Sequence, residues 1–176
     1  EDWLGTLPLV AGSCLAEALA GVLNLAPRMK WPNDVLVEGS KVAGILGEIP
    51  EPGRVILGIG LNVWEAPDAI DPATVTALSE WGLSGHDAVA RAVESFVSGF
   101  FRRVEKGGDQ LGEENREFIR EHLATVGQSV RVSMPDGSTV VGVASDVDGA
   151  GRLVVTTASR DVVISAGDIE HLRTAQ

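Results

Sequence analysis

The spacing of apolar residues changes along the chain, and this feature most limits what the chain can fold into. Residues 7–23 carry an apolar side chain every three or four positions, which predicts an amphipathic helix. Beyond Arg28 the apolar residues form short β-rich runs between turn-type sequences, which predicts three consecutive antiparallel strands. These runs are residues 35–37, 42–46 and 55–63. Because the run 55–63 is apolar on both faces, we expect a central strand that is covered on both sides.

Helical spacing returns in the middle of the chain. A long apolar stripe predicts a second helix that is capped at Ser84 or Asp87 and ends at Gly107. A shorter stripe from Leu111 to Leu123 predicts a third helix.

The last part of the chain has another pattern. From Gln128 onward valine, threonine and serine alternate with polar residues, and turn sequences recur about every ten residues. Four or five short strands of this kind favour a small closed β-barrel, because closure removes exposed edges. The predicted fold class is α/β, more closely α+β. Residues 1–125 form a central mixed, largely antiparallel sheet with packed helices, and residues 126–176 form the small barrel domain.

Charge and cysteine content exclude several classes of protein. Fourteen lysines and arginines stand against twenty-five acidic residues, giving a formal net charge of −11, so a binder of nucleic-acid phosphates is disfavoured. The single cysteine, Cys14, excludes an intramolecular disulfide and a multi-cysteine zinc site. No apolar run reaches the ~18 residues that span a bilayer. We expect a cytoplasmic protein without a membrane or DNA partner.

Two clusters of residues can carry chemistry. The first is Lys30-Trp31-Pro32-Asn33-Asp34, from which a hairpin returns to Lys41 and should bring Asp34 and Lys41 together. The second is Gly58-Ile59-Gly60-Leu61-Asn62-Val63, whose glycines remove side chains from a strand. The lysine can neutralise negative charge, the aspartate can bind a metal ion or orient a donor, and the two asparagines suit the edge of a purine. These groups fit an anionic, nucleotide-sized ligand better than a peptide or a sugar.

Simpler interpretations of the same residues stay open at this point. Pro-Asn-Asp is a common turn, and a lysine at the start of a strand usually guards an exposed edge. The glycine pair Gly58 and Gly60 lacks the third glycine and the following helix of a dinucleotide-binding fingerprint, so that fold is excluded.

Taken together, three blocks resemble the central motifs of biotin protein ligases, the enzymes that join biotin to biotin-dependent carboxylases. The blocks stand in the order and spacing of that family. They are Lys30-Trp31-Pro32-Asn33-Asp34, Lys41-Val42-Ala43-Gly44-Ile45-Leu46 and Gly58-Ile59-Gly60-Leu61-Asn62-Val63. The resemblance extends over the later helices to the C-terminal barrel, which it implies has SH3-like topology.

The resemblance implies a reaction in two steps. The carboxylate of biotin attacks the α-phosphorus of ATP, with Mg²⁺, to give biotinyl-5′-AMP and pyrophosphate. A lysine of a biotin carboxyl carrier protein then displaces AMP. Lys41 matches the family lysine that contacts the biotin carboxylate and the phosphate oxygens. Asp34 matches a pocket carboxylate that acts through the metal or by orienting Lys41.

The resemblance also implies which residues bind biotin and ATP. The two asparagines match residues that face the nucleotide, and glycines of two strands lie along the biotin channel, where the ligand can rest against the backbone. The expected set is Asn33, Asn62, Gly44, Gly58, Gly60 and Trp31.

One departure from the family affects what we expect of the chain. The family's Gly- and Arg-rich loop, which folds over biotin and the adenylate, has no counterpart here, since Arg28 is the first arginine. We therefore expect an N-terminally incomplete ligase that adenylates biotin poorly. Dimers through sheet edges occur in the family, so a homodimer is left open. The alternatives are a lipoate-type acyl-adenylate ligase and a non-catalytic ligase remnant that binds a carrier.

Overall fold

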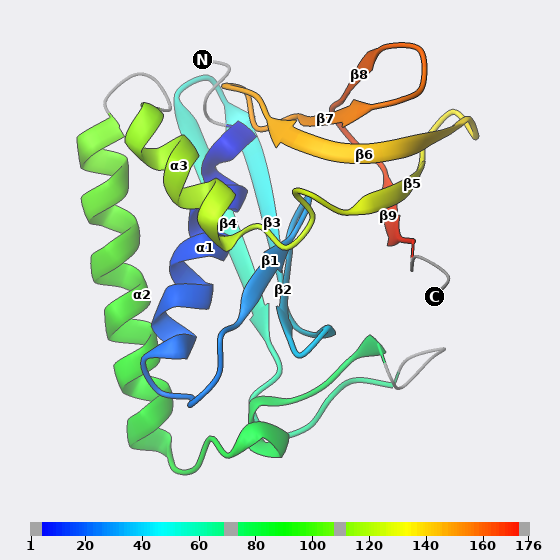
Figure 1. The fold of residues 1–176 in the computed structure, drawn as a ribbon. Helices are drawn as coiled ribbons and strands as arrows, with labels where there is room; N and C mark the ends of the chain where they lie inside the picture. Colours follow the sequence, from blue (N-terminus) through cyan, green and yellow to red (C-terminus); the bar gives the residue numbers. More distant parts are fainter. Residues whose placement is uncertain (1–4, 69–73, 108–111, 173–176) are drawn as a thin grey trace.

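Two antiparallel sheets and three α-helices make up the part of the chain that the computed structural model describes, residues 5–68, 74–107 and 112–172 (Figure 1). The first sheet has the strand order β1-β2-β3-β4, and the second has the order β8-β7-β6-β5-β9. The strands of the first sheet are β1 (Arg28–Lys30), β2 (Asp34–Val37), β3 (Ser40–Glu51) and β4 (Arg54–Leu61). Those of the second are β5 (Ser129–Ser133), β6 (Thr139–Val147), β7 (Leu153–Thr156), β8 (Asp161–Ile164) and β9 (Asp168–His171). The α+β class with antiparallel sheets is confirmed.

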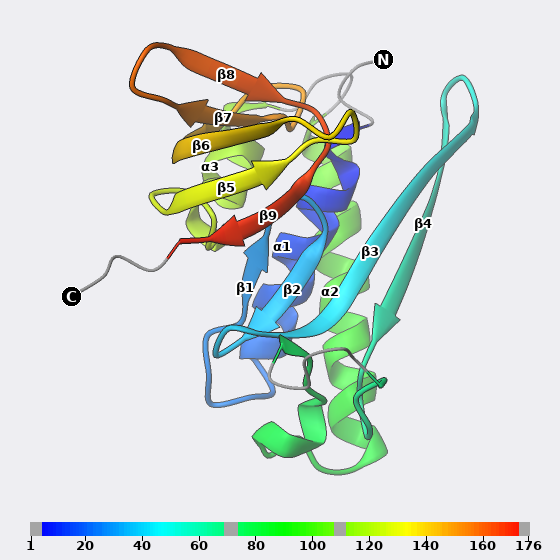
Figure 2. The ribbon, with the colours of Figure 1, turned by 90° about the vertical axis from the view of Figure 1, so that its right-hand side faces the viewer.

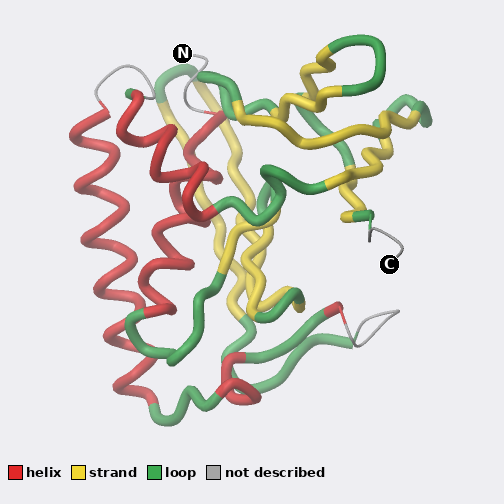
Figure 3. The backbone as a smooth tube through the Cα atoms, viewed as in Figure 1, coloured by secondary structure: helices red, strands yellow, loops and turns green. Residues whose placement is uncertain are grey.

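The helices cover one face of the first sheet, while no helix is drawn in front of its other face (Figures 2 and 3). Helix α1 (Leu7–Ala20) is almost entirely buried, because it contacts β1, β2 and β3 as well as α2 (His86–Gly107). Helix α3 (Glu113–His122) contacts α1 and β6. The three predicted helices are confirmed, although Leu111 lies outside the described residues. No described helix is long and apolar enough to cross a membrane.

Strand β4 is an edge strand in the described part of the chain, so the prediction of a central strand at residues 55–63 is wrong. The strand order of the first sheet ends with β4. Its residues are exposed or half-buried, and Ile56 keeps 48% of its surface exposed. A run of apolar residues indicates apolar partners on both faces, but the helices supply them on one face only.

The second sheet follows the predicted alternation closely. In β5 every second residue is buried, and Val130 and Val132 are fully inaccessible. The turns between its strands lie at the predicted glycine-rich positions, with Gly137 and Gly151 both at positive φ. Strands β8 and β9 each pair on one side only within the described residues. Closure of this sheet into an SH3-like barrel therefore stays a prediction.

One hydrophobic cluster joins the second sheet to the rest of the chain. It includes Leu9 of α1 and Met29 of β1 together with Val132 of β5 and Leu153 of β7. A second cluster fills the space between the first sheet and helices α1 and α2. The shared cluster fixes the second sheet against α1 and β1, while a domain boundary between residues 125 and 126 stays a prediction.

Candidate functional site

An ammonium–carboxylate pair lies on the β2–β3 hairpin. Lys41 Nζ is 2.5 Å from Asp34 Oδ1, so the predicted proximity of the two residues is confirmed. Strands β2 and β3 pair Asp34 with Gly44, and a register shift places Leu36 opposite Lys41, so the lysine side chain reaches back along the strand. The Lys41 side chain is 41% exposed and that of Asp34 is 22% exposed. The pair is therefore partly desolvated but open to a ligand.

Two glycines leave bare backbone beside this ammonium group. A Cβ atom on Gly44 would lie 3.3 Å from both Cε and Nζ of Lys41, so a side chain there would press on the pair. Gly60 is the partner of Gly44 in β4, and a Cβ atom on it would meet nothing within 4 Å. Glycines in strand interiors are typical of places where a ligand approaches the backbone closely.

A cavity of about 440 Å³ opens over these glycines. Its lining comes from β3, β4 and the loop that follows β4. The lining residues are Lys41, Ala43, Gly44, Gly60, Leu61, Asn62, Pro67, Asp68 and Val75. The Asn62 Nδ2 group donates a hydrogen bond to the Thr76 carbonyl oxygen at 3.0 Å, which orients the amide. Asn62 therefore keeps its carbonyl oxygen, an acceptor, and its second amide N–H for a ligand.

The open face of the β3–β4 hairpin continues from this cavity as an apolar surface. The register of the two strands places Leu46 opposite Gly58, on the same face as Gly44 and Gly60. Leu46 is 60% exposed, and Ile56, the next residue of β4 on that face, is 48% exposed. Gly58 thus lies farther along the hairpin than the residues that line the cavity.

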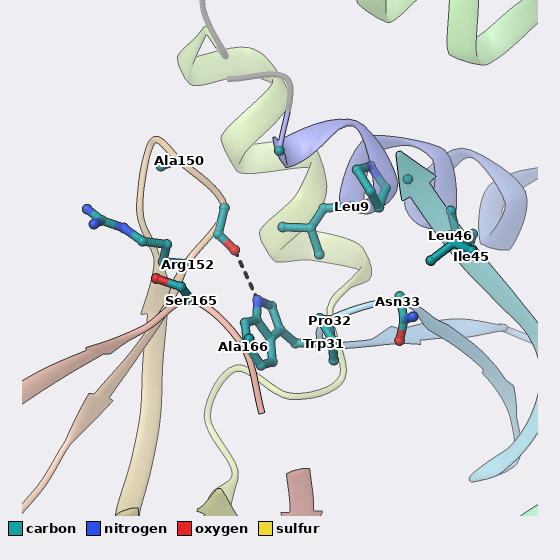
Figure 4. Close-up of a pocket in the computed structure, with 14 residues that line it drawn as sticks. Leu9, Trp31, Pro32, Asn33, Ile45, Leu46, Ala150, Arg152, Ser165 and Ala166 are labelled. Carbon is teal, nitrogen blue, oxygen red and sulfur yellow. Dashed lines mark hydrogen bonds between the residues drawn. The ribbon is translucent and has the colours of Figure 1, made fainter. Parts of the chain in front are cut away.

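A second cavity, of about 700 Å³, lies where α1 and the first sheet meet the second sheet (Figure 4). Its lining residues are Gly5, Pro8, Leu9, Trp31, Pro32, Asn33, Ile45, Leu46, Gly47, Ala150, Gly151, Arg152, Ser165 and Ala166. Trp31 and Asn33 line this cavity, whereas Lys41 and Asn62, which were expected in the same ligand site, line the smaller one. Their roles in binding stay predictions.

Trp31 connects the first sheet to the second. Its side chain is 2% exposed, and its indole Nε1 donates to the Gly151 carbonyl oxygen at 3.0 Å (Figure 4). The Trp31 backbone N–H donates to Thr125 Oγ1 at 3.0 Å, and this oxygen is 3.3 Å from His171 Nε2. Burial lowers the pKa of His171 and the charge of Lys30 lowers it further, so the imidazole is neutral at pH 7. Because the indole N–H is used within the protein and the ring is buried, Trp31 offers a ligand almost no free surface.

The described residues contain no group of three or more His, Cys, Asp or Glu side chains that could hold a metal ion. Asp34 is one carboxylate and is already paired with Lys41. A metal ion at this site therefore needs most of its ligands from a bound substrate such as a polyphosphate.

No motif in the sequence predicted that some residues would line the two cavities. Pro67, Asp68 and Val75 reach the Lys41 cavity because the chain turns back after β4, and Thr76 N donates to the Lys41 carbonyl oxygen at 2.9 Å. Gly151 reaches the other cavity from a hairpin turn of the second sheet. Neither contact follows from a local motif, and only the glycine-rich turn and the Pro/Asp content of the loop hinted at special positions.

Comparison with known proteins identifies relatives over nearly the whole chain. Residues 125–172 match the family described as "Biotin protein ligase C terminal domain". The chain is 39% identical to the "Biotin--[acetyl-CoA-carboxylase] ligase" of Mycobacterium tuberculosis, over 98% of this chain and 64% of that protein. It is 30% identical to the protein of the same name from Paracoccus denitrificans, over 93% of this chain and 71% of that protein. The chain thus spans about two thirds of the length of these relatives.

Solved structures share the fold. The apo structure of the biotin protein ligase from Aquifex aeolicus has a TM-score of 0.78 at 22% identity, covering 95% of this chain and 75% of that one. The same protein in complex with biotin and ATP has a TM-score of 0.76 at 25% identity, covering 96% and 72%. The Paracoccus relative matches over more than two thirds of both sequences. By this relationship and the shared fold, the chain belongs to the biotin--[acetyl-CoA-carboxylase] ligase family.

Proposed function

We propose that this chain carries the reacting site of a biotin protein ligase. Such an enzyme activates biotin with ATP and transfers the biotinyl group to a lysine of a biotin carboxyl carrier protein. The observation that carries the proposal is the Lys41–Asp34 pair beside the bare backbone of Gly44 and Gly60. The biotin protein ligase of Aquifex aeolicus has been solved in complex with biotin and ATP, which supports the same substrates here.

In the first step a carboxylate oxygen of biotin bonds to the α-phosphorus of ATP while the bond to pyrophosphate breaks. Both reactants are anions and repel one another. An ammonium group held in place before the reaction stabilises the charge of both without reorganisation. Asp34 holds the Lys41 Nζ, and partial burial makes this contact stronger than it would be in open solvent.

In the second step a neutral lysine amine of the carrier attacks the acyl carbon of biotinyl-5′-AMP. The amide bond forms, the carbon–oxygen bond to AMP breaks with its electron pair, and the amine loses a proton. In this proposal the ammonium of Lys41 remains beside the phosphate and stabilises the departing AMP.

The remaining groups divide between the two substrates. The apolar face with Leu46 and Ile56 suits the ring system and aliphatic chain of biotin, and Gly58 and Gly60 leave it room. The Asn62 carbonyl oxygen can accept a hydrogen bond from the amino group of adenine. Asn33 binds from the adjoining cavity, where Trp31, which is 2% exposed, forms part of the wall. Mg²⁺ would enter as part of the MgATP substrate, and Asp34 would be the protein carboxylate nearest to it.

The test of the proposal is the binding of biotinyl-5′-AMP to the chain, measured by isothermal titration calorimetry. We expect Lys41→Ala to weaken binding at least 30-fold, since it removes one charge-assisted contact of about 2 kcal/mol. Arg54→Ala removes the same charge from the hairpin tip, where the side chain is 64% exposed, and should change the affinity less than twofold. Equal affinities of the parent and Lys41→Ala would contradict the role of Lys41.

Thermal unfolding of the chain in the presence of biotin or lipoate distinguishes a biotin ligase from a lipoate-type ligase. We expect biotin to raise the unfolding temperature and lipoate to leave it unchanged, because a ligand stabilises the folded state only when its concentration exceeds its dissociation constant, and then logarithmically. A response to lipoate without one to biotin would replace the proposal with a lipoate-type ligase. Binding of a carrier protein without any response to biotin or ATP would indicate a non-catalytic remnant.

We further propose that the 176 residues alone catalyse the first step slowly. They contain no arginine before Arg28, so no Gly- and Arg-rich loop is present to exclude water and hold the phosphate. Biotin-dependent ATP–pyrophosphate exchange should be at least 100-fold slower than that of the M. tuberculosis relative. Equal rates would contradict this. We also propose that the protein acts in the cytoplasm. Whether it forms a homodimer is tested by light scattering, which measures its mass in solution.

A further inference from the structure

The second sheet meets the reacting site through one turn of the chain. Residues 31–33 form the turn between β1 and β2, and Lys30 pairs with Asp34 across it. We propose that Trp31 and Thr125 are positioning residues that fix this turn, and with it Asp34, relative to the second sheet. The inference rests on the proposed function for the identity of the ligand, and it gives the C-terminal part of the chain a role in the reaction.

Hydrogen bonds from the segment between α3 and β5 and from the second sheet hold the turn on its β1 side. Thr125 Oγ1 accepts the Trp31 backbone N–H at 3.0 Å, and the Gly151 carbonyl oxygen accepts the indole N–H at 3.0 Å. Next to these bonds, the Ala124 N–H donates to the Met29 carbonyl oxygen at 2.7 Å. Thr125 is fully inaccessible to solvent and Trp31 is 2% exposed, so water cannot replace these bonds.

The location of Trp31 fixes that of the Lys41–Asp34 pair, because only two residues separate Trp31 from Asp34. The Asn33 carbonyl oxygen accepts a hydrogen bond from Ile45 N at 2.8 Å, and Asp34 then pairs with Gly44. Asp34 contacts Lys41 Nζ through its Oδ1 atom. A displacement of the turn at Trp31 therefore changes where Asp34 and Lys41 lie, and reactions of this kind lose much of their rate when groups move by about 1 Å.

Packing alone is the competing explanation, since Trp31 also belongs to the hydrophobic cluster that joins the sheets. Substitutions that keep the shape but remove a hydrogen bond separate the two. Trp31→Phe retains an aromatic ring and removes the indole N–H. Thr125→Val retains the volume and leaves the Trp31 backbone N–H without an acceptor, whereas Thr125→Ser keeps the hydroxyl group.

The experiment combines biotinyl-5′-AMP affinity with amide resonances. Both are measured on the whole chain at a temperature at which every variant is folded. We expect Thr125→Val and Trp31→Phe to weaken binding at least tenfold and to shift the amide resonances of Asp34 and Gly44. Thr125→Ser should bind within threefold of the parent. Thr156→Val is the matched control, because its hydroxyl bonds to Ser145 and Asp161 lie within the second sheet, and it should change the affinity less than twofold.

The outcomes separate this inference from the proposed function. If the parent binds biotinyl-5′-AMP, unchanged affinity in both Thr125→Val and Trp31→Phe overturns the inference, even if the unfolding temperature falls. If the parent does not bind, the proposed function fails, and the resonances of Asp34 and Gly44 decide the positioning role. If Thr125→Val does not fold, Trp31→Phe decides.

Discussion

The two sheets of this protein use similar strands in opposite ways. In the second sheet the buried and exposed residues of β5 alternate, and the apolar side chains point into a shared cluster. In the first sheet β3 and β4 leave Leu46 and Ile56 exposed beside glycines that carry no side chain. Apolar residues in a strand thus serve two purposes: buried ones such as Val130 and Val132 of β5 stabilise the fold, and those on the open face of the first sheet are available to a ligand.

The largest expected contrast concerns two leucines, one in each sheet. Leu153 in β7 is fully buried, so Leu153→Ala should lower the free energy of unfolding by about 3 kcal/mol through lost burial and the cavity left behind. Leu46 is 60% exposed, so Leu46→Ala should lower it by less than about 0.5 kcal/mol while weakening ligand binding. Urea unfolding of both variants measures the contrast. Similar losses in the two would break the comparison.

A second contrast uses two glycines that are changed to the same residue. A Cβ atom on Gly142 in β6 would collide with the Thr156 carbonyl oxygen, so Gly142→Ala should destabilise the fold by about 2 kcal/mol. On Gly60 in β4 the Cβ atom would meet nothing within 4 Å, so Gly60→Ala should leave the stability unchanged or raise it by about 0.5 kcal/mol. Thermal unfolding gives both values. A clear loss of stability in Gly60→Ala would show that the open face is packed after all.

The smallest contrast concerns ion pairs. Arg120 joins α3 to β6 through two contacts with Asp146, Nε–Oδ1 at 2.6 Å and Nη2–Oδ2 at 2.7 Å. These hydrogen bonds hold the pKa of Asp146 below its ordinary value. The pair therefore contributes its full stability above the carboxyl's unfolded-state pKa of about 4, and loses it as the pH falls through the lowered pKa.

Asp146→Asn should accordingly cost about 1 kcal/mol at pH 7, a modest value because both side chains are about one-third exposed, and should flatten the acid limb of the stability curve. Chemical unfolding between pH 3 and pH 7 measures it. The exposed Glu51–Arg54 pair is the control, since Glu51→Gln should change stability by less than about 0.3 kcal/mol. The same acid limb in Asp146→Asn and the parent would assign the pH dependence to other groups.

Local patterns predicted much of this fold, and long-range contacts explain what they missed. The Lys41–Asp34 contact follows from one short hairpin, and the turns of the second sheet follow from alternation between neighbouring strands. The edge position of β4 depends on which elements pack beside it, and the run of apolar residues carries no information on that. The contact between Trp31 and Gly151 spans 120 positions, so no window along the chain contains both partners.

The unequal lengths of β2 and β3 have a consequence for how molecules of this protein meet one another. Strand β3 has twelve residues and β2 has four, so beyond Ile45 the described part of β3 pairs with β4 alone. An unpaired strand edge of this kind can add a strand from another molecule. Here Pro50 has no N–H group to donate, and Glu48 and Glu51 carry like charges that repel a second copy. The β3–β4 hairpin can thus stay exposed at high protein concentration without promoting aggregation through strand addition.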